Sequence, residues 1–314
     1  MKGDSRSVAY KILYQFEKKN DSIPNIRKLI FSKYPKNNEL KFRSTVLVNE
    51  IIRFRGRLDL MIIFVSGKKL NFLNKKILTI LRIGFYEIIF DPKVPDYAAV
   101  DSSVNLAHKF ANKKTIGFTN AVLRKLVRKK NKNNNWYKEL ELKSGWFSIP
   151  SWIEKRWLIN FGKKNLVKLI KFINQTPRIF VRCDNVFNSM EKNIRLLELE
   201  GIKSKLFSHN FLMIQSNKNK VLSSKLFKNG DISIQSPSAA AIVDCLEINK
   251  GDVVLDVCAA PGTKTLQLAN LVGIDGCIYA SDISSERVSL GKKDEKRHGK
   301  KNIKWSLKDA RVDA

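Results

Sequence analysis

Long apolar runs and an export signal are both missing from this 314-residue sequence. No stretch reaches the roughly 18 consecutive apolar residues that a membrane-spanning helix needs. The first residues, MKGDSRSVAYKILYQF, are amphipathic from the outset and lack the apolar segment and the cleavage site of a signal peptide. We therefore expect a cytoplasmic protein without a membrane partner, and we expect it to be a monomer.

Cysteine is scarce, and its spacing excludes several kinds of site. The four cysteines are Cys183, Cys245, Cys258 and Cys277. They form no CxxC pair and lack metal-ligand spacing, so the sequence predicts no metal site. Free thiols are the default in a reducing cytoplasm. Cys245 lies on an apolar helix and Cys277 in a strand, and for both we expect small buried side chains.

Acidic residues are also few, because 29 Asp and Glu stand against 59 Lys and Arg, which gives a net charge of +30. A surplus of this size attracts polyanions over long distances. Aromatic residues and arginines are mixed among the lysines, which favours nucleic acid as the partner. A membrane surface is a weaker alternative because no basic amphipathic helix stands apart. A drift toward a Lys- and Asn-rich composition, without any partner, stays open.

Residues 4 to 130 predict one helix after another. In the segment LNKKILTILRIGFYEIIF, helical spacing puts five residues on one face: Leu73, Ile77, Leu81, Gly84 and Ile88. We expect an all-α domain over residues 1–130. The polar, aperiodic run from Lys129 to Asn135 is the expected linker to the next domain.

Basic residues gather at the end of the last helix expected in this domain. They are Arg124, Lys125, Arg128, Lys129 and Lys130. Cations at a helix C-terminus compensate the helix dipole, but five charges in seven residues exceed that need. Dipole compensation and a phosphate-facing patch both stay open.

The pattern changes after the linker. SIPSWIEKRWLINFG predicts a helix that starts at a proline, and RIFVRC and FLMIQ predict short strands. SMEKNIRLLELEG predicts a helix opened by Ser189 and closed by Gly201. We expect a small α+β domain over residues 136–232.

Residues 233–314 alternate strictly between helices and strands. VVLDV, GCIYASDI and NIKWSL predict three strands with a helix between each pair. This alternation indicates parallel βαβ units of an α/β domain. In such domains the ligand lies outside the carboxyl ends of the strands.

The turn after the first of these strands has an unusual composition. In LDVCAAPGTKTLQL, Asp256 ends the strand and a helix is expected to begin near Thr263 or Lys264. The backbone N–H groups of a helix start favour a carboxylate or a phosphate. Gly262 allows close approach and unusual dihedral angles. The turn therefore predicts a site for a charged group.

Two further acids follow the next two strands. Asp282 ends the second strand, where an acid suits a ribose diol, and Asp309 follows the third, within reach of an adenine edge. Taken singly, each acid could be a helix cap or a loop residue. Together with Asp256 they indicate a cofactor that contains a nucleoside. The segment is neither GxGxxG nor GxxxxGK[ST], so the dinucleotide and P-loop patterns both fail.

The segment DVCAAPGTKT resembles the cofactor loop of the RNA (cytosine-5)-methyltransferases of the Sun/NOL/NOP type, DxCAAPGGKT. GDISIQSPSAAAIVDCL resembles the lead-in of that family, and SIPSWI and RIFVRCDN resemble its small domain. LRIGFYEIIF, VPDYAAVDSSVNLA and GFTNAVLRK are similar to the NusB-like RNA-binding domain. The combination points to the bacterial 16S rRNA branch, the Sun/RsmB family. Thr263 stands where that pattern has its second glycine.

The resemblance implies a NusB-like all-α domain, a small α+β domain and a partial Rossmann-like α/β domain at 233–314. It implies S-adenosyl-L-methionine as cofactor and small-subunit rRNA as partner. The residues expected to wrap the methionine end are Cys258, Ala259, Ala260, Pro261, Gly262, Thr263 and Lys264. Asp282 is expected to hold the ribose, and Asp309 to lie near the adenine.

The same resemblance implies that a cysteine thiolate adds to C6 of the cytosine before C5 accepts the methyl group. The family carries its nucleophile and a second cysteine on PCS-type and TCS-type loops beyond the third strand, and this sequence contains neither. Cys258 matches a position that lines the cofactor, and Cys183 replaces a family valine. We therefore assign no catalytic residue.

A Rossmann-like sheet is expected to continue on the other side of VVLDV. Without further strands, we expect that strand to have an open edge and an uncovered apolar face. The sequence thus predicts a truncated family member that lacks methyl transfer in isolation. The alternative is an RNA-binding module with a vestigial catalytic domain. An antitermination factor like free NusB is a weaker option, because it would have no use for residues 136–314.

Overall fold

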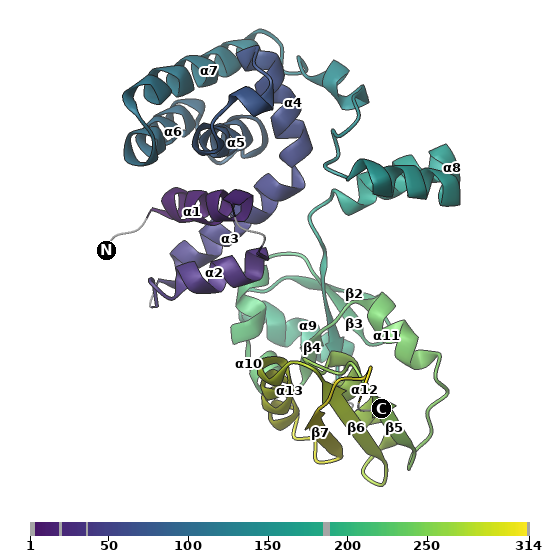
Figure 1. The fold of residues 1–314 in the computed structure, drawn as a ribbon. Helices are drawn as coiled ribbons and strands as arrows, with labels where there is room; N and C mark the ends of the chain where they lie inside the picture. Colours follow the sequence, from purple (N-terminus) through teal and green to yellow (C-terminus); the bar gives the residue numbers. More distant parts are fainter. Residues whose placement is uncertain (1–3, 19–20, 36, 185–188, 313–314) are drawn as a thin grey trace. The chain divides into compact units, whose positions relative to one another are not determined.

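The computed structural model describes residues 4–312, apart from residues 19–20, 36 and 185–188 (Figure 1). The chain divides into two compact units, Met1–Thr176 and Pro177–Ala314. The first unit is all-α and the second contains two β-sheets, as expected from the sequence. Within the described residues, no helix has the length and apolar character needed to cross a membrane.

The first unit is built from eight α-helices and two short 3₁₀ turns among its described residues. They are α1 (Ser5–Lys18), α2 (Ile23–Phe31), α3 (Asn38–Arg53), α4 (Arg55–Ser66), η1 (Leu70–Phe72), α5 (Lys75–Phe90), α6 (Asp96–Phe110), α7 (Lys113–Lys132), η2 (Lys138–Leu142) and α8 (Ser151–Ile173). Side chains of α1–α7 form one hydrophobic core.

Helix α5 lies at the centre of this core. Leu81 is fully buried and Ile88 nearly so, as their spacing in the sequence predicts. Gly84 is required for packing rather than for its backbone angles. A Cβ atom there would lie 2.7 Å from Ser103 Oγ and 2.9 Å from Leu123 Cδ2. The glycine therefore lets α6 and α7 approach α5 closely.

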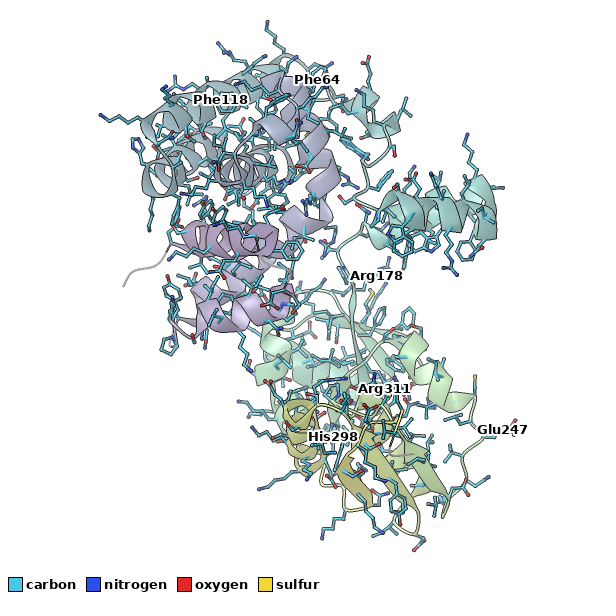
Figure 2. All side chains as sticks on the ribbon, in the orientation of Figure 1. Phe64, Phe118, Arg178, Glu247, His298 and Arg311 are labelled. Atoms are coloured by element: carbon cyan, nitrogen blue, oxygen red, sulfur yellow. The ribbon has the colours of Figure 1, made fainter. Side chains whose placement is uncertain are left out.

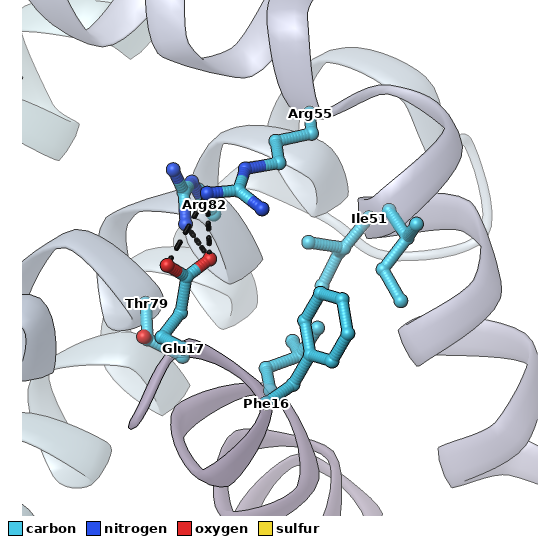
Figure 3. A pocket seen from close by; sticks show the side chains of 8 residues that line it. Phe16, Glu17, Ile51, Arg55, Thr79 and Arg82 are labelled. Carbon is cyan, nitrogen blue, oxygen red and sulfur yellow. Dashed lines mark hydrogen bonds and ion pairs between the residues drawn. The ribbon is translucent and has the colours of Figure 1, made fainter. Parts of the chain in front are cut away.

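A charged cluster is buried beside the apolar core of the first unit (Figure 3). Arg82 is 5% exposed and donates to Asp59 through two bonds, Nε to Oδ1 at 2.7 Å and Nη2 to Oδ2 at 2.9 Å. Its Nη1 lies 2.9 Å from Glu17 Oε1. Figure 3 shows the Glu17 carboxylate facing both Arg82 and Arg55. The buried guanidinium thus has a carboxylate on each side, which the cost of burying a charge demands.

The first part of the linker expected from Lys129 to Asn135 is helical, because α7 continues through Lys132. Lysine and asparagine are tolerated in a helix, and Lys129 accepts a backbone bond at the helix end from Asn133. Lys130 of the basic run is held inside the unit, since its Nζ donates to Ile88 O at 2.8 Å and Asp96 Oδ1 at 2.7 Å. By its contacts, the segment after α7 up to Thr176 belongs with the helical unit. The three domain boundaries expected from the sequence stay a prediction.

The second unit contains seven strands, five α-helices and one short 3₁₀ turn among its described residues. They are β1 (Ile179–Cys183), α9 (Met190–Leu199), β2 (Ser204–Ser208), β3 (Phe211–Ile214), η3 (Lys218–Ser223), α10 (Lys225–Lys228), β4 (Ile232–Ile234), α11 (Pro237–Asp244), β5 (Val253–Asp256), α12 (Thr263–Val272), β6 (Cys277–Asp282), α13 (Ser285–Arg297) and β7 (Ile303–Leu307). The first four strands form an antiparallel sheet in the order β2-β3-β1-β4. The last three form a parallel sheet in the order β5-β6-β7.

Among the described residues, helices cover one face of the parallel sheet and leave the other uncovered. On the covered face, Ile278, Ala280 and Ile303 are buried in a small core with residues of α12. On the other face, Val253 is 69% and Leu255 is 68% exposed. Among the described strands, β5 pairs with β6 alone. The open edge and the uncovered apolar face expected for VVLDV are therefore confirmed.

Candidate cofactor-binding site

Three acids lie where the parallel strands end, as the sequence predicts. Asp256 is the last residue of β5 and Asp282 is the last residue of β6. Asp309 comes two residues after the end of β7 at Leu307. Because the strands are parallel, their carboxyl ends meet at one edge of the sheet. This edge is the candidate site.

The turn between β5 and α12 forms an elbow, which we define as Cys258–Gly262. Gly262 precedes the helix with φ of +107°, a conformation that favours glycine. A Cβ atom there would lie 3.1 Å from the ring of Trp305 on β7. Helix α12 begins at Thr263, and no side chain caps its first turn. The N–H groups of that turn are therefore available to an electronegative group of a ligand.

The residues of the elbow differ in exposure. Cys258 and Pro261 are exposed, as is Lys264 in the first turn of α12, whereas Ala259 and Ala260 are buried. Ala259 N donates to the carbonyl oxygen of Ser281 at 2.9 Å, which fastens the elbow to β6. The two small side chains thus form the floor of the turn and the other three residues form its outer wall.

Thr265 ties the first strand to the helix of the elbow. Its Oγ1 donates to Asp256 Oδ2 at 2.8 Å, and the residue is fully buried. Asp256 therefore orients α12 through a side-chain bond. Thr265 was not singled out in the sequence, although its place in the first turn after an acid-ended strand is a usable signal.

Asp282 connects β6 to the elbow. It is 3% exposed and accepts from Ala260 N at 3.2 Å and from Ser284 N at 3.0 Å. Arg287, in the first turn of α13, lies 3.2 Å from Asp282 Oδ2 through its Nη1. The guanidinium also donates to the carbonyl oxygen of Ala260. Arg287 was not singled out in the sequence because an arginine in a helix gives no sign of what it contacts.

Asp309 is paired with Arg311, which Figure 2 labels. Arg311 Nη2 lies 2.6 Å from Asp309 Oδ2, and Arg311 Nε lies 3.0 Å from Oδ1. These hydrogen bonds lower the pKa of Asp309 below its ordinary value. The structure thus joins Asp282 directly to the elbow, and gives Asp309 an ionised carboxylate beside the third strand.

The cysteines are distributed differently from the sequence expectation. Cys245 is exposed, because it caps α11 beyond the buried residues Ala240 and Val243, so its expected burial is wrong. Cys277 is half-buried at the start of β6. Burial raises the pKa of the Cys183 thiol to about 12, so it stays protonated at neutral pH and is a poor nucleophile.

A parallel α/β sheet with a glycine elbow and acids at its carboxyl edge defines a Rossmann-like domain. Two family models match the chain: the NusB family over residues 3–128, and the 16S rRNA methyltransferase RsmB/F family over residues 243–313. The chain therefore joins a NusB family domain to a methyltransferase domain of the RsmB/F family.

Whole-chain comparisons agree with this domain combination. The probable ribosomal RNA small subunit methyltransferase B of Bacillus subtilis is 26% identical over 313 residues, which cover 98% of this chain and 68% of that protein. The ribosomal RNA small subunit methyltransferase B of Escherichia coli is 24% identical over 304 residues, with 94% and 67% covered. The crystal structure of PH0851 has the same fold, with a TM-score of 0.70, 23% identity, and 99% and 71% covered.

Proposed function

We propose that this chain binds S-adenosyl-L-methionine at the elbow and small-subunit rRNA through its basic surface, as part of a cytosine-5 methyltransferase. The observation that carries the proposal is the elbow itself. Its first helical turn has no side-chain cap, its glycine has a positive φ, and a buried carboxylate lies behind it. Family membership supports methyl transfer as the reaction class.

The residues at the site fit this cofactor chemically. The segment Cys258–Lys264 would hold the methionine end, because uncapped N–H groups of α12 suit its carboxylate. Asp282 would accept from the ribose hydroxyls, and the ionised Asp309 would accept from the adenine amino group. When bound, the cofactor supplies a methyl group on a sulfonium.

The nucleophile loops that the family resemblance implies have no counterpart among these 314 residues. The 314 residues contain no PCS-type or TCS-type loop, and the pKa of Cys183 is raised by burial. We therefore propose that this chain on its own binds cofactor and RNA without turnover. The test is transfer of labelled methyl from S-adenosylmethionine to small-subunit rRNA, and measurable turnover by these 314 residues would overturn this part of the proposal.

The proposed partner is RNA, and more narrowly small-subunit rRNA. A net charge of +30 favours a polyanion, and α7 contains eight Lys and Arg without a single acid. The curated relatives are named for the small ribosomal subunit. We further propose that the protein is cytoplasmic, like the rRNA that it would bind, and that it is a monomer.

A second candidate function is an RNA-binding module whose methyltransferase domain is vestigial. One observation favours it: the Asp282 carboxylate already accepts from Ala260 N and Ser284 N and pairs with Arg287. A ribose would have to compete with, or displace, the Arg287 guanidinium. Cofactor binding separates the two candidates.

Calorimetric titration with S-adenosylmethionine tests the proposal. We expect the wild type to bind and Asp282→Asn to bind at least about tenfold more weakly, because one acceptor oxygen becomes a donor. Asparagine keeps an acceptor for the Ala260 N–H. The control is Asp275→Asn, an exposed acid in the turn before β6. A wild type that does not bind favours the second candidate, and equal binding by Asp282→Asn refutes the ribose assignment.

A further inference from the structure

Charged side chains at the end of β1 form hydrogen bonds with one side of helix α12. Arg182 is 2% exposed, and its Nη1 donates to Gln267 Oε1 at 3.1 Å and to the carbonyl oxygen of Thr263 at 3.4 Å. Asp184, just past β1, accepts from Asn270 Nδ2 at 3.1 Å. The antiparallel sheet thus reaches the helix whose first turn forms the candidate site.

The three residues of α12 that bond to Arg182 and Asp184 follow the helical repeat. Thr263, Gln267 and Asn270 are spaced by four and by three residues, so they lie along one stripe of α12 that begins at its first residue. Leu266 and Ala269 lie on another stripe and pack with Ile278 and Ala280 of the parallel sheet. The helix is therefore held from two sides, by apolar packing on one and by polar bonds on the other.

The polar side is a network of several hydrogen bonds rather than a single bond. Arg182 Nε donates to Asp184 Oδ1 at 2.7 Å, and Arg182 Nη1 also donates to Gln235 Oε1 just after β4. Gln267 Nε2 donates in turn to Asp244 Oδ1 at 3.0 Å and to Ala240 O at 3.2 Å, both in α11. The amide of Gln267 is thus fixed at both ends.

Such a network fixes position more than it adds stability. Burying an Arg–Asp pair costs desolvation that its attraction only roughly offsets, so apolar residues could serve stability as well. Hydrogen bonds of a planar guanidinium are directional, and a shift of α12 along its axis by about one ångström would break them. Apolar contacts between α12 and the parallel sheet would tolerate a small slide more easily.

We propose that Arg182 is a positioning residue for the candidate site: with Asp184, it sets the axial position of α12 and so the geometry of its uncapped first turn and of Gly262. The antiparallel sheet would then control cofactor affinity from outside the family-matched methyltransferase segment. The effect on affinity rests on the proposed function, whereas the effect on the helix does not.

Arg297 offers a matched control in the same unit. It is a largely buried arginine that joins α13 to the antiparallel sheet, with Nη1 donating to Ile232 O at 3.1 Å and Nε to Asp294 Oδ1 at 2.6 Å. Its neighbour His298, labelled in Figure 2, has Nε2 3.0 Å from Ser233 Oγ on β4. The bonds of the Arg297 side chain go to β4, α10, α13 and His298 rather than to α12.

The experiment compares Arg182→Met and Arg297→Met in the full chain by two readouts. Amide hydrogen exchange of residues 266–270, whose N–H groups donate within the helix, reports on the N-terminal half of α12, and calorimetry reports the Kd for S-adenosylmethionine. For Arg182→Met we expect at least tenfold faster exchange and at least a tenfold higher Kd. For Arg297→Met we expect comparable loss of Tm with both quantities within twofold of wild type.

Each outcome either supports or overturns the positioning role of Arg182. Unchanged exchange in Arg182→Met, or equal changes in both variants, overturns the positioning role. If the wild type binds no cofactor, the proposed function fails and the exchange rates alone decide on Arg182. If Arg182→Met does not fold, Gln267→Met removes the acceptor on α12 instead. It should speed the same exchange about threefold or more, and exchange at the wild-type rate refutes the proposal.

Discussion

The helical unit and the parallel sheet bury their apolar side chains to very different extents. All of the largest fully buried side chains of the described residues lie between Ile12 and Leu126. In contrast, β5 exposes more than two-thirds of the surface of both Val253 and Leu255. A helical bundle closes its core with neighbours along the chain, whereas a parallel sheet needs a layer on each face. One family domain is thus closed by its own contacts, and the other keeps an apolar face toward solvent.

The largest loss of unfolding free energy is expected when a buried charge is removed from the helical unit. Arg82→Met leaves Asp59 and Glu17 without their main cation, so the unfolding free energy of this unit should fall by about 3–5 kcal/mol. Urea denaturation, followed by circular dichroism, measures the loss. The control is Arg43→Met, which breaks an exposed pair with Glu39 and should cost about 0.5 kcal/mol at most. Equal losses would mean that burial does not set the difference.

The same substitution in the two regions tests the comparison directly. Leu81→Ala removes a fully buried side chain and should cost about 2–5 kcal/mol, because a cavity is left in a packed core. Leu255→Ala changes a side chain that is 68% exposed and should cost about 0.5 kcal/mol or less. Thermal unfolding of both variants compares the two losses of stability. A large loss for Leu255→Ala would show that the open face is covered in solution.

Substitutions of two glycines compare the packing of the two regions, with smaller expected changes in stability. Gly291→Ala would place a Cβ atom 2.4 Å from the Trp305 ring, so overpacking should cost about 1–3 kcal/mol. Gly117→Ala, in α7, meets nothing within 4 Å and should stabilise the helical unit by about 0.5–1 kcal/mol. Differential scanning calorimetry gives both shifts. Shifts of the same sign would contradict the packing described around Trp305.

The smallest effect concerns thiol reactivity at constant stability. At pH 8 the Cys183 thiol should resist alkylation, because its pKa of about 12 leaves almost no thiolate and the side chain is largely buried. Cys258 and Cys245 are exposed and should react first. Mass spectrometry after brief iodoacetamide treatment, with denatured protein as the control, orders the sites. Fast labelling of Cys183 in the native protein would show that β1 opens.

The elbow and its acids could be predicted from the sequence because their signals are local. An apolar strand, an acid and a Pro-Gly turn before a helix are contiguous in the chain, and the structure has β5 end at Asp256 and α12 start at Thr263. The all-α character of the first unit was equally clear from helical spacing. The roles assigned to Asp282 and Asp309 stay predictions that binding experiments can test.

Other features depend on contacts between distant residues and left no local signal. Arg287 differs from an ordinary helix residue only because it pairs with a strand-end acid, Asp282. Strands β2 and β4 were not recognised, since SKLFS and ISI are short and partly polar. Cys245 was expected inside because the apolar segment AAAIV precedes it, yet the helix ends there and turns the thiol outward.

The indole of Trp305 beneath the elbow makes the site optically observable. Trp305 is the sole tryptophan after Trp157, and its ring lies 3.1 Å from the point where a Gly262 side chain would start. Its Nε1 donates to Glu295 Oε2 at 2.9 Å, so its environment responds to shifts of α13 as well. In a variant with the four other tryptophans replaced by phenylalanine, emission would report occupancy of the elbow in real time, without a label on either molecule.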